Sequence, residues 1–237
     1  MKLEKIAKPF KHDIHFDIEK LDSDYHCYVL FVDIMGMKTT MLRSFSQSTI
    51  FMGKLHCALN DLQYKFRAIK IYPVMDGAYI VSKEREAMVG FIKYLFKYLG
   101  EVFVSANKPE NCFLVRGCLA FGPMIDGELI DKGVNRQLAE NVEYKNKLLF
   151  GFPMILAYNG ERKAPPFGIY LDTTVRVAAN RELSGIWYKW CKDMVLKEKI
   201  QNGLKSYFQW AKSKSLELMY DEDKIENHEK LSTQYWG

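Results

Sequence analysis

The stretch Cys27-Tyr28-Val29-Leu30-Phe31-Val32-Asp33 decides how we expect this chain to fold. It is rich in β-branched and aromatic residues, almost continuously apolar, and soon followed by Gly36. A run of this kind is typical of a strand that is buried on both faces of a sheet. We therefore expect the strand to end on a carboxylate, that of Asp33.

The segments after this strand alternate between helical and strand patterns. Apolar residues recur at helical spacing over 46–66 and 84–104, which predicts two amphipathic helices packed on the sheet. Between them, Asp76-Gly77 predicts the tight turn of a hairpin whose strands cover 68–73 and 78–81. The later pattern predicts a strand over 112–121 closed by a turn at Gly122-Pro123, a surface loop over 126–147, a helix over 153–162, a strand over 167–171 and a long helix beyond Asn180.

This order of elements predicts an α+β fold, with helices packed on one face of a mainly antiparallel sheet. We divide the chain into a polar N-terminal lead-in (1–26), a central domain (27–180), and a C-terminal helical extension and tail (181–237). Of the 237 residues, 48% are hydrophobic and 27% are charged, which suits one globular domain with appendages.

Charge and cysteine content limit the classes of partner. The net charge is +5 with dispersed lysines, which fits an anionic ligand, whereas the absence of a basic run interleaved with aromatics argues against stable nucleic acid binding. The five cysteines include no CxxC pair, so we expect buried, reduced thiols. With no leader-like apolar segment and no stretch of about 18 apolar residues, we expect a cytoplasmic protein without a membrane partner.

Two carboxylates carry the chemistry that we predict. Mg²⁺ and Mn²⁺ take oxygen ligands, and a nucleotide site commonly supplies one or two carboxylates in addition to substrate phosphates. If the first strand lies beside the hairpin, Asp33 and Asp76 can converge on two divalent ions, with the carbonyl of Ile34 completing a metal shell. The other interpretation is that each aspartate is only a turn former or a helix cap.

The turn between Asp33 and the next helix is the predicted phosphate site. It reads Ile34-Met35-Gly36-Met37-Lys38. Because Gly36 removes a side chain from this turn, we expect successive backbone N–H groups to face phosphate oxygens.

These motifs resemble the class III nucleotidyl cyclases, the catalytic domains of adenylate and guanylate cyclases. Phe31-Val32-Asp33-Ile34-Met35-Gly36 is similar to the metal and phosphate motif of that family, and Val74-Met75-Asp76-Gly77-Ala78-Tyr79 to its second metal-binding hairpin. The segment 115–122 resembles the arginine-containing strand of the family, and 150–161 its dimer-facing helix. The resemblance covers residues 27–175 and implies a ferredoxin-like, palm-type sheet, two Mn²⁺ or Mg²⁺ ions, and a homodimer with composite sites.

The departures from the family pattern concern the transition state and the base. In the family register, Ile155 and Asn159 replace the usual asparagine and arginine. Asn159 remains able to donate a hydrogen bond, and Arg116 or Arg136 is a candidate for the missing charge. Tyr72 and Leu148 replace the usual adenine-selecting lysine and aspartate, and a tyrosine there would fill space that a purine needs. The alternative is that Tyr72 simply points into the core.

This pattern resembles the bacterial branch that makes cyclic UMP or cyclic CMP as a second messenger in anti-phage defence. The resemblance implies a phosphorus-oxygen lyase that converts UTP, or less favourably CTP, to its 3′,5′-cyclic monophosphate and pyrophosphate. A purine cyclase with a rewired base pocket and a non-catalytic nucleotide-binding module are the alternatives. Against the module, two adjacent carboxylates without an ion between them would repel each other.

Overall fold

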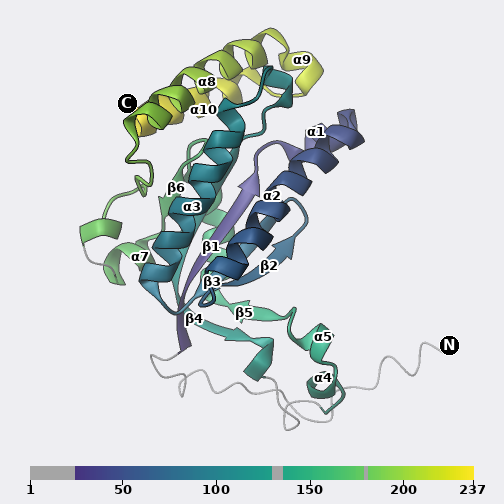
Figure 1. The fold of residues 1–237 in the computed structure, drawn as a ribbon, viewed down its shortest axis with the longest axis vertical. Coiled ribbons are helices and arrows are strands. Elements are labelled where there is room, and N and C mark those ends of the chain that lie inside the picture. The colour runs from purple at the N-terminus through teal and green to yellow at the C-terminus, as the bar shows by residue number, and fades with distance from the viewer. Residues whose placement is uncertain (1–24, 130–135, 179–180) are drawn as a thin grey trace, which may run out of the picture.

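The computed structural model describes residues 25–129, 136–178 and 181–237, and the first strand lies at the centre of its sheet (Figure 1). β1 (His26–Ile34) pairs antiparallel with β3 (Gly77–Ser82) on one side and β4 (Val115–Asp126) on the other. Its residues alternate between two apolar clusters, one on each face of the sheet. The prediction of a strand buried on both faces is therefore confirmed.

The sheet has six strands and is mainly antiparallel, as predicted. The order is β2-β3-β1-β4-β5, and β6 pairs with β4 in parallel. The three strands not yet delimited are β2 (Lys70–Val74), β5 (Leu149–Gly151) and β6 (Ile169–Leu171). The hairpin predicted at Asp76-Gly77 is the β2–β3 connection.

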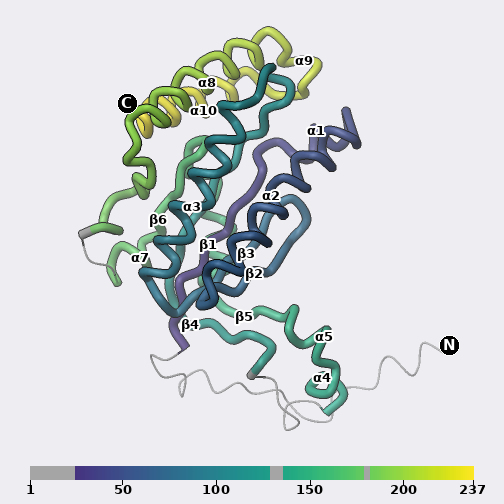
Figure 2. The backbone as a smooth tube through the Cα atoms, in the orientation of Figure 1, coloured from purple at the N-terminus to yellow at the C-terminus, as the bar shows by residue number. Residues whose placement is uncertain are grey.

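Two long helices cover one face of this sheet (Figures 1 and 2). They are α2 (Phe45–Lys65) and α3 (Arg85–Val104), and their bounds agree with the predicted helices within one residue. α1 (Met37–Arg43) precedes α2 as a separate short helix, because Ser44 has extended backbone and its side chain caps α2 by accepting from the Gln47 N–H. The opposite face carries α6 (Phe152–Gly160), which packs against the cluster of Val29 and Phe31.

The predictions for residues 112–147 are wrong in part. The strand that we expected to end at Gly122-Pro123 continues to Asp126. β1 begins at His26, opposite Pro123, and β4 then pairs with β5 instead, so the proline lies where the strand changes partner. The predicted loop 126–147 contains a 3₁₀ turn and two short helices in its described part, η5 (Gly127–Leu129), α4 (Arg136–Glu140) and α5 (Val142–Lys145).

The C-terminal extension consists of helices that lie across the end of α3 (Figure 2). They are α8 (Met194–Ser213), α9 (Ser215–Leu218) and α10 (Glu222–Trp236). Leu204, Phe208 and Trp236 belong to the same buried cluster as the sheet and α3. The indole N–H of Trp236 donates to the Pro166 carbonyl at 3.2 Å, so the extension is joined to the central domain by packing and by hydrogen bonds.

Four short elements complete the fold. η4 (Pro109–Asn111) lies between α3 and β4, and η6 (Glu161–Lys163) lies between α6 and β6. α7 (Thr173–Ala178) and η7 (Arg181–Leu183) lie between β6 and α8. The predicted lead-in lies outside the described residues up to residue 24, and so does the predicted boundary at Asn180.

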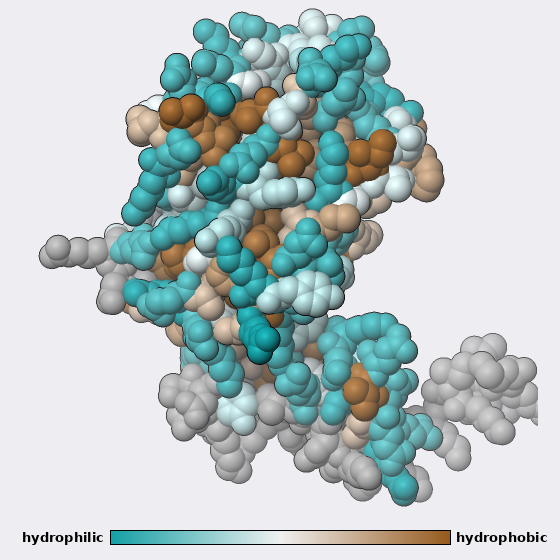
Figure 3. Space-filling model, in the orientation of Figure 1, coloured by the Kyte–Doolittle hydropathy of each residue, from teal (hydrophilic) through white to brown (hydrophobic). Residues whose placement is uncertain are grey.

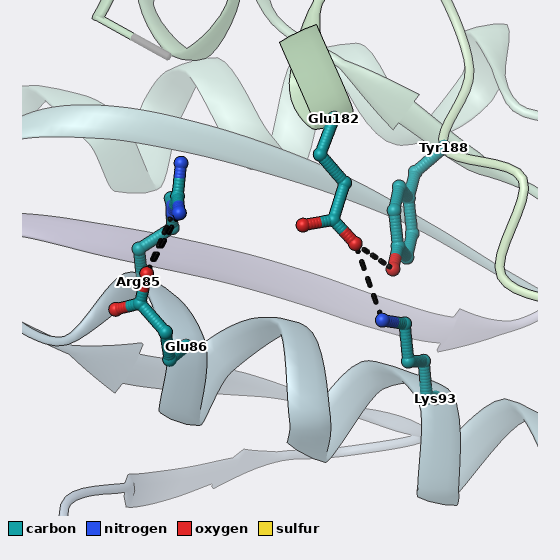
Figure 4. A network of polar contacts seen from close by, with 5 residues as sticks. All are labelled: Arg85, Glu86, Lys93, Glu182 and Tyr188. Carbon is teal, nitrogen blue, oxygen red and sulfur yellow. Dashed lines mark hydrogen bonds and ion pairs between the residues drawn. The ribbon is translucent and has the colours of Figure 1, made fainter. Parts of the chain in front are cut away.

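A small polar network fixes the connecting segment to α3 (Figure 4). Glu182 accepts from the Lys93 ammonium at 3.2 Å and from the Tyr188 hydroxyl at 3.3 Å. The pair Arg85–Glu86, at 2.7 Å, lies at the start of the same helix. Because Lys93 and Glu182 are both partly exposed, their ion pair contributes no more than about 1 kcal/mol, and burial of the apolar helices supplies most of the attachment.

The face seen in Figure 3 is mostly hydrophilic, and hydrophobic residues are visible at the level of the C-terminal helices, near the top, and below them. Exposed apolar side chains near that end include Leu42, Phe45 and Leu216. Among the helices that the structure describes, none has the length and apolar character needed to cross a membrane.

Candidate active site

Asp33 and Asp76 come together at the end of the sheet where β1 ends and the β2–β3 turn lies. Asp33 lies near the end of β1 and pairs with Gly77, the residue after Asp76, and the Ile34 N–H donates to the Asp76 carbonyl at 3.3 Å. A Cβ at position 77 would lie 2.5 Å from the Val32 carbonyl oxygen and 3.1 Å from Asp33 Oδ1. Gly77 is therefore required for this close approach of the hairpin to the first carboxylate.

The electrostatics of this end of the sheet favour a cation. Burial, followed by the neighbouring carboxylates of Asp76 and Glu161, raises the pKa of Asp33 to about 7, although Arg116 opposes this rise. Among the described residues there is no group of three or more His, Cys, Asp or Glu side chains that could hold an ion. A nucleotide-bound ion needs only one or two carboxylates, because phosphate oxygens and water complete its shell. The aspartate pair fits that kind of metal site and does not fit a closed protein cage.

The β1–α1 turn supplies fewer free amides than the sequence predicted. The Ile34 and Met35 N–H groups are used within the fold, the first by Asp76 and the second by the Leu114 carbonyl at 2.8 Å. The N–H groups of Gly36, Met37 and Lys38 donate to no residue that the structure describes. Gly36 has φ +73°, a conformation that favours glycine, and the Met37 side chain is buried in the core, so Met37 offers only its backbone to a ligand.

Arg116 lies beside Asp33, on the neighbouring strand β4. The two residues are partners in the β1–β4 register. Arg116 Nε forms an ion pair with Glu161 at the end of α6, and Nη1 contacts His228 Nε2 on α10 at 3.2 Å. Part of the positive charge of Arg116 is therefore balanced within the protein, and its guanidinium is held from two sides.

The histidine on α10 was not found from the sequence. His228 Nδ1 contacts the Tyr220 hydroxyl, and burial, followed by Arg116 and Lys224, lowers the pKa of His228 to about 4. A guanidinium can only donate, so His228 Nε2 accepts from Arg116 and Nδ1 carries the proton toward Tyr220. No sequence motif indicates this contact, which joins residues 112 positions apart.

Neither Arg136 nor Asn159 forms a hydrogen bond or an ion pair with Asp33 or Asp76 among the residues that the structure describes. Arg136 is on α4, largely exposed, and pairs with Glu140 at 3.0 Å; Arg116, by contrast, acts on the pKa of Asp33. Asn159 and Ile155 are exposed on α6. Phe152 and Tyr158 are also exposed on this helix, so α6 presents an apolar surface with Asn159 at its end.

Tyr72 and Leu148, the predicted base-pocket residues, lie near a partly exposed cluster of charged side chains. Lys70 contacts Asp126 at 2.6 Å and Glu128 at 2.7 Å. Burial, then Asp126, raises the pKa of Tyr72 to about 12, and the Leu148 carbonyl accepts from the Gly127 N–H at 3.0 Å. The ring of Tyr72 is half-buried against the smaller apolar cluster. Sequence patterns missed the ion cluster because its members come from two separate segments of the chain.

Comparisons with known proteins agree on the fold. No protein-family model and no curated protein sequence matches this chain. One similar structure is a bacterial light-regulated adenylyl cyclase, with a TM-score of 0.52 and 13% identity over 66% of this chain and 46% of that chain. Another is of adenylate cyclases from Trypanosoma brucei in their monomeric state, with a TM-score of 0.51 and 13% identity over 68% of this chain and 79% of that chain. The chain thus has the curled, mainly antiparallel α+β fold of the class III cyclases.

Proposed function

We propose that this protein is a nucleotidyl cyclase that converts a pyrimidine nucleoside triphosphate, UTP in preference to CTP, to its 3′,5′-cyclic monophosphate and pyrophosphate. The observation that carries this proposal is the meeting of Asp33 and Asp76 at the end of β1, beside the turn at Gly36, in a cyclase fold. Two carboxylates next to unused backbone amides suit a metal-bound polyphosphate.

The residues that would hold two Mn²⁺ or Mg²⁺ ions are Asp33, Asp76 and the carbonyl of Ile34. When bound, such ions lower the pKa of a ribose hydroxyl and neutralise the leaving pyrophosphate. In the reaction, the 3′ oxygen forms a bond to the α-phosphorus and loses its proton to solvent, while the bond to the bridging oxygen breaks. The amides from Gly36 to Lys38 would orient the phosphates for this in-line displacement.

Arg116 is our candidate for stabilising the negative charge that develops on the α-phosphoryl group. Its Nη2 remains to donate, because Nε and Nη1 are held by Glu161 and His228. Preorganised donors of this kind act without reorganisation at the moment of reaction. Asn159 would add a hydrogen bond from the partner subunit of a homodimer.

The apolar face of α6 supports that homodimer. Phe152 is 63% exposed, Ile155 56% and Tyr158 51%, and an exposed apolar group of this kind commonly marks an interaction surface. In a head-to-tail dimer, each active site would combine the aspartates of one subunit with Asn159, Tyr72 and Leu148 of the other.

Tyr72 and Leu148 are our reason for proposing a pyrimidine base in the substrate. Neither side chain reproduces the hydrogen bonds that adenine requires, and the tyrosine ring occupies space beside the sheet. Purine cyclisation fits the same fold and is the alternative. By the resemblance that led to this substrate, we also propose that the product is a cytoplasmic signal in antiviral defence.

One experiment tests the reaction and the base together. Purified protein is incubated with each of the four ribonucleoside triphosphates and Mn²⁺, and the products are identified by mass. We expect cyclic UMP, or cyclic CMP at a lower rate. A purine product would move the proposal to the alternative substrate class, and no product together with metal-dependent nucleotide binding would indicate a non-catalytic module.

A further inference from the structure

A cavity of about 220 Å³ lies between the β1–α1 turn and the C-terminal helices. Met35 and Gly36 line it from the turn, Arg116 from β4, and Lys224 and His228 from α10. The two aspartates and the base-pocket residues are not part of its wall. The cavity nevertheless adjoins the aspartate pair, because Met35 and Gly36 closely follow Asp33 and Arg116 is its partner in the β1–β4 register. It is smaller than the roughly 300–1,000 Å³ of pockets that enclose a whole small-molecule ligand.

The charged side chains in this wall suit an anion. They are the cations Arg43, Arg116 and Lys224 and one carboxylate, Glu110. Lys224 is paired with Asp221 at 2.5 Å, but both side chains are about two-thirds exposed, at 69% and 67%. Such an exposed pair is weak, so Lys224 can exchange Asp221 for a ligand at little cost.

Arg43 is similarly available. Its Nη2 donates to the neutral side-chain oxygen of Gln47 at 3.0 Å, and this contact leaves the charge of Arg43 without a carboxylate partner. Arg43 also lies close enough to Tyr207, which lines the same cavity, to lower the pKa of that phenol, although burial outweighs it and the pKa is raised to about 12. Arg43 on α1 and Lys224 on α10 thus line the same cavity.

Arg116, the third cation of the cavity wall, is oriented by His228 of the C-terminal extension. Because a guanidinium can only donate, His228 accepts from Arg116 Nη1 and donates through Nδ1 to Tyr220. Because the Tyr220 oxygen accepts this hydrogen bond, its own hydroxyl proton is left for a ligand in the cavity that it lines. Arg116 and Tyr220 both line this cavity, so Arg116 Nη2 and the Tyr220 hydroxyl are the donors left for a ligand.

We propose that this cavity is a binding site for the pyrophosphate end of the nucleotide, and for pyrophosphate after cyclisation, with Lys224 and the His228–Arg116 contact supplied in cis by α10. A compact polyanion matches its volume, and charge-assisted hydrogen bonds from arginine and lysine are the strong contacts to phosphate. The origin of this pyrophosphate rests on the proposed function, whereas the site itself rests on the cavity and its charges. The extension would then complete the active site as well as stabilise the fold.

The test measures binding of inorganic pyrophosphate by calorimetry in EDTA, so that no divalent ion at the aspartate pair contributes. Lys224→Ala should weaken binding by about tenfold or more, as the loss of a charged hydrogen bond predicts. Lys230→Ala is the matched control, because Lys230 is exposed on the same helix and does not line the cavity. His228→Leu should weaken binding, and His228→Gln should weaken it less, since an amide oxygen can still accept from Arg116.

The outcomes separate this site from the proposed reaction. No pyrophosphate binding by the wild type, or equal binding by the Lys224→Ala and Lys230→Ala variants, would overturn the cavity proposal even if a cyclic nucleotide is formed. Lys224-dependent pyrophosphate binding without a product from any of the four nucleotides would support the site and refute the cyclase. Because Lys224 is exposed, loss of folding does not account for the expected change, and an unchanged melting temperature checks this.

Discussion

Asp33 and Arg116 are direct partners across β1 and β4, at the end of the sheet where the β2–β3 turn and α10 also meet. The guanidinium lowers the pKa of this aspartate, but burial and the carboxylates of Asp76 and Glu161 outweigh it, and the pKa is raised to about 7. Burial and the neighbouring carboxylates therefore disfavour the ionised form of Asp33, and a bound cation would offset that penalty.

The first prediction concerns the aspartate pair. Mn²⁺ should raise the melting temperature of the wild type, since an ion that binds only the folded state stabilises it by about 2.7 kcal/mol at 100 times its dissociation constant. Asp33→Asn should remove most of this effect and lower kcat by about 10²-fold or more, as loss of electrostatic stabilisation at a reacting centre does. Asp61→Asn, at an exposed position of α2, is the control. Wild-type Mn²⁺ stabilisation in Asp33→Asn would refute this metal site.

The second prediction concerns the base. Tyr72→Ala should increase the kcat/KM for ATP or GTP relative to UTP by about tenfold, because it opens space beside the smaller apolar cluster. Tyr72→Phe should leave the ratio near that of the wild type, since the ring is kept. Tyr64→Ala removes a 79% exposed tyrosine on α2 and serves as the control. An unchanged ratio in Tyr72→Ala would mean that this side chain does not select the base.

The central part of the fold could be predicted because its signals are local. The apolar run before Asp33 identified β1, the Asp76-Gly77 pair identified the hairpin, and helical spacing identified α2 and α3. Each pattern depends on residues within one element, where burial on one or both faces constrains the sequence directly. The approach of Asp33 to Asp76 followed from these elements and from the register of β1 with β3.

The surroundings of the site could not be predicted because they depend on contacts between distant segments. Glu161 appeared only as part of a helix pattern, yet it is buried and pairs with Arg116. His228 lies in a charged segment with no motif, and only the packing of α10 brings it to β4. The three-residue strand β5 is too short for a periodic signal.

The third prediction concerns the homodimer. Ile155→Asp places a charge in the exposed apolar face of α6 and should shift the protein toward a monomer and reduce activity together, because a charged group would have to be buried at the interface. Leu216→Asp is the control, since Leu216 is 95% exposed on α9. Light scattering coupled to size-exclusion chromatography measures the state. A dimer that persists in Ile155→Asp with full activity would place the interface elsewhere.

The fourth prediction concerns the extension. Trp236 is buried, and its indole donates to Pro166 in the central domain. Trp236→Ala should therefore lower the free energy of unfolding by about 3–5 kcal/mol, the usual cost of removing a buried aromatic side chain. Leu216→Ala should change it by less than about 0.5 kcal/mol.

Urea denaturation followed by circular dichroism and by tryptophan fluorescence tests this coupling. Because the extension and the central domain share one buried cluster, the two probes should report one coincident transition. Two separate transitions would show that residues 181–237 unfold independently of the central domain.

The fifth prediction concerns the pH dependence of stability at His228. Burial and the charges of Arg116 and Lys224 lower its pKa from 6.5 to about 4, so between these values the unfolded chain binds more protons than the folded one. The contribution of His228 is therefore complete above pH 6.5 and is lost as the pH falls toward 4. The raised pKa of Asp33 acts in the opposite direction, so the pH profile of the wild type alone does not isolate the histidine.

The difference between the wild type and His228→Gln isolates it. The glutamine cannot be protonated in this range, so the stability of the wild type relative to this variant should decrease as the pH is lowered from 6.5 to 4. His56→Gln, in which the histidine that contacts the Met75 carbonyl is replaced, is the control for a histidine-to-glutamine change away from Arg116. Urea midpoints measured at half-unit pH steps provide the comparison. Parallel profiles for the wild type and His228→Gln would show that folding leaves the pKa of His228 unchanged, which contradicts a buried, neutral imidazole that accepts from Arg116.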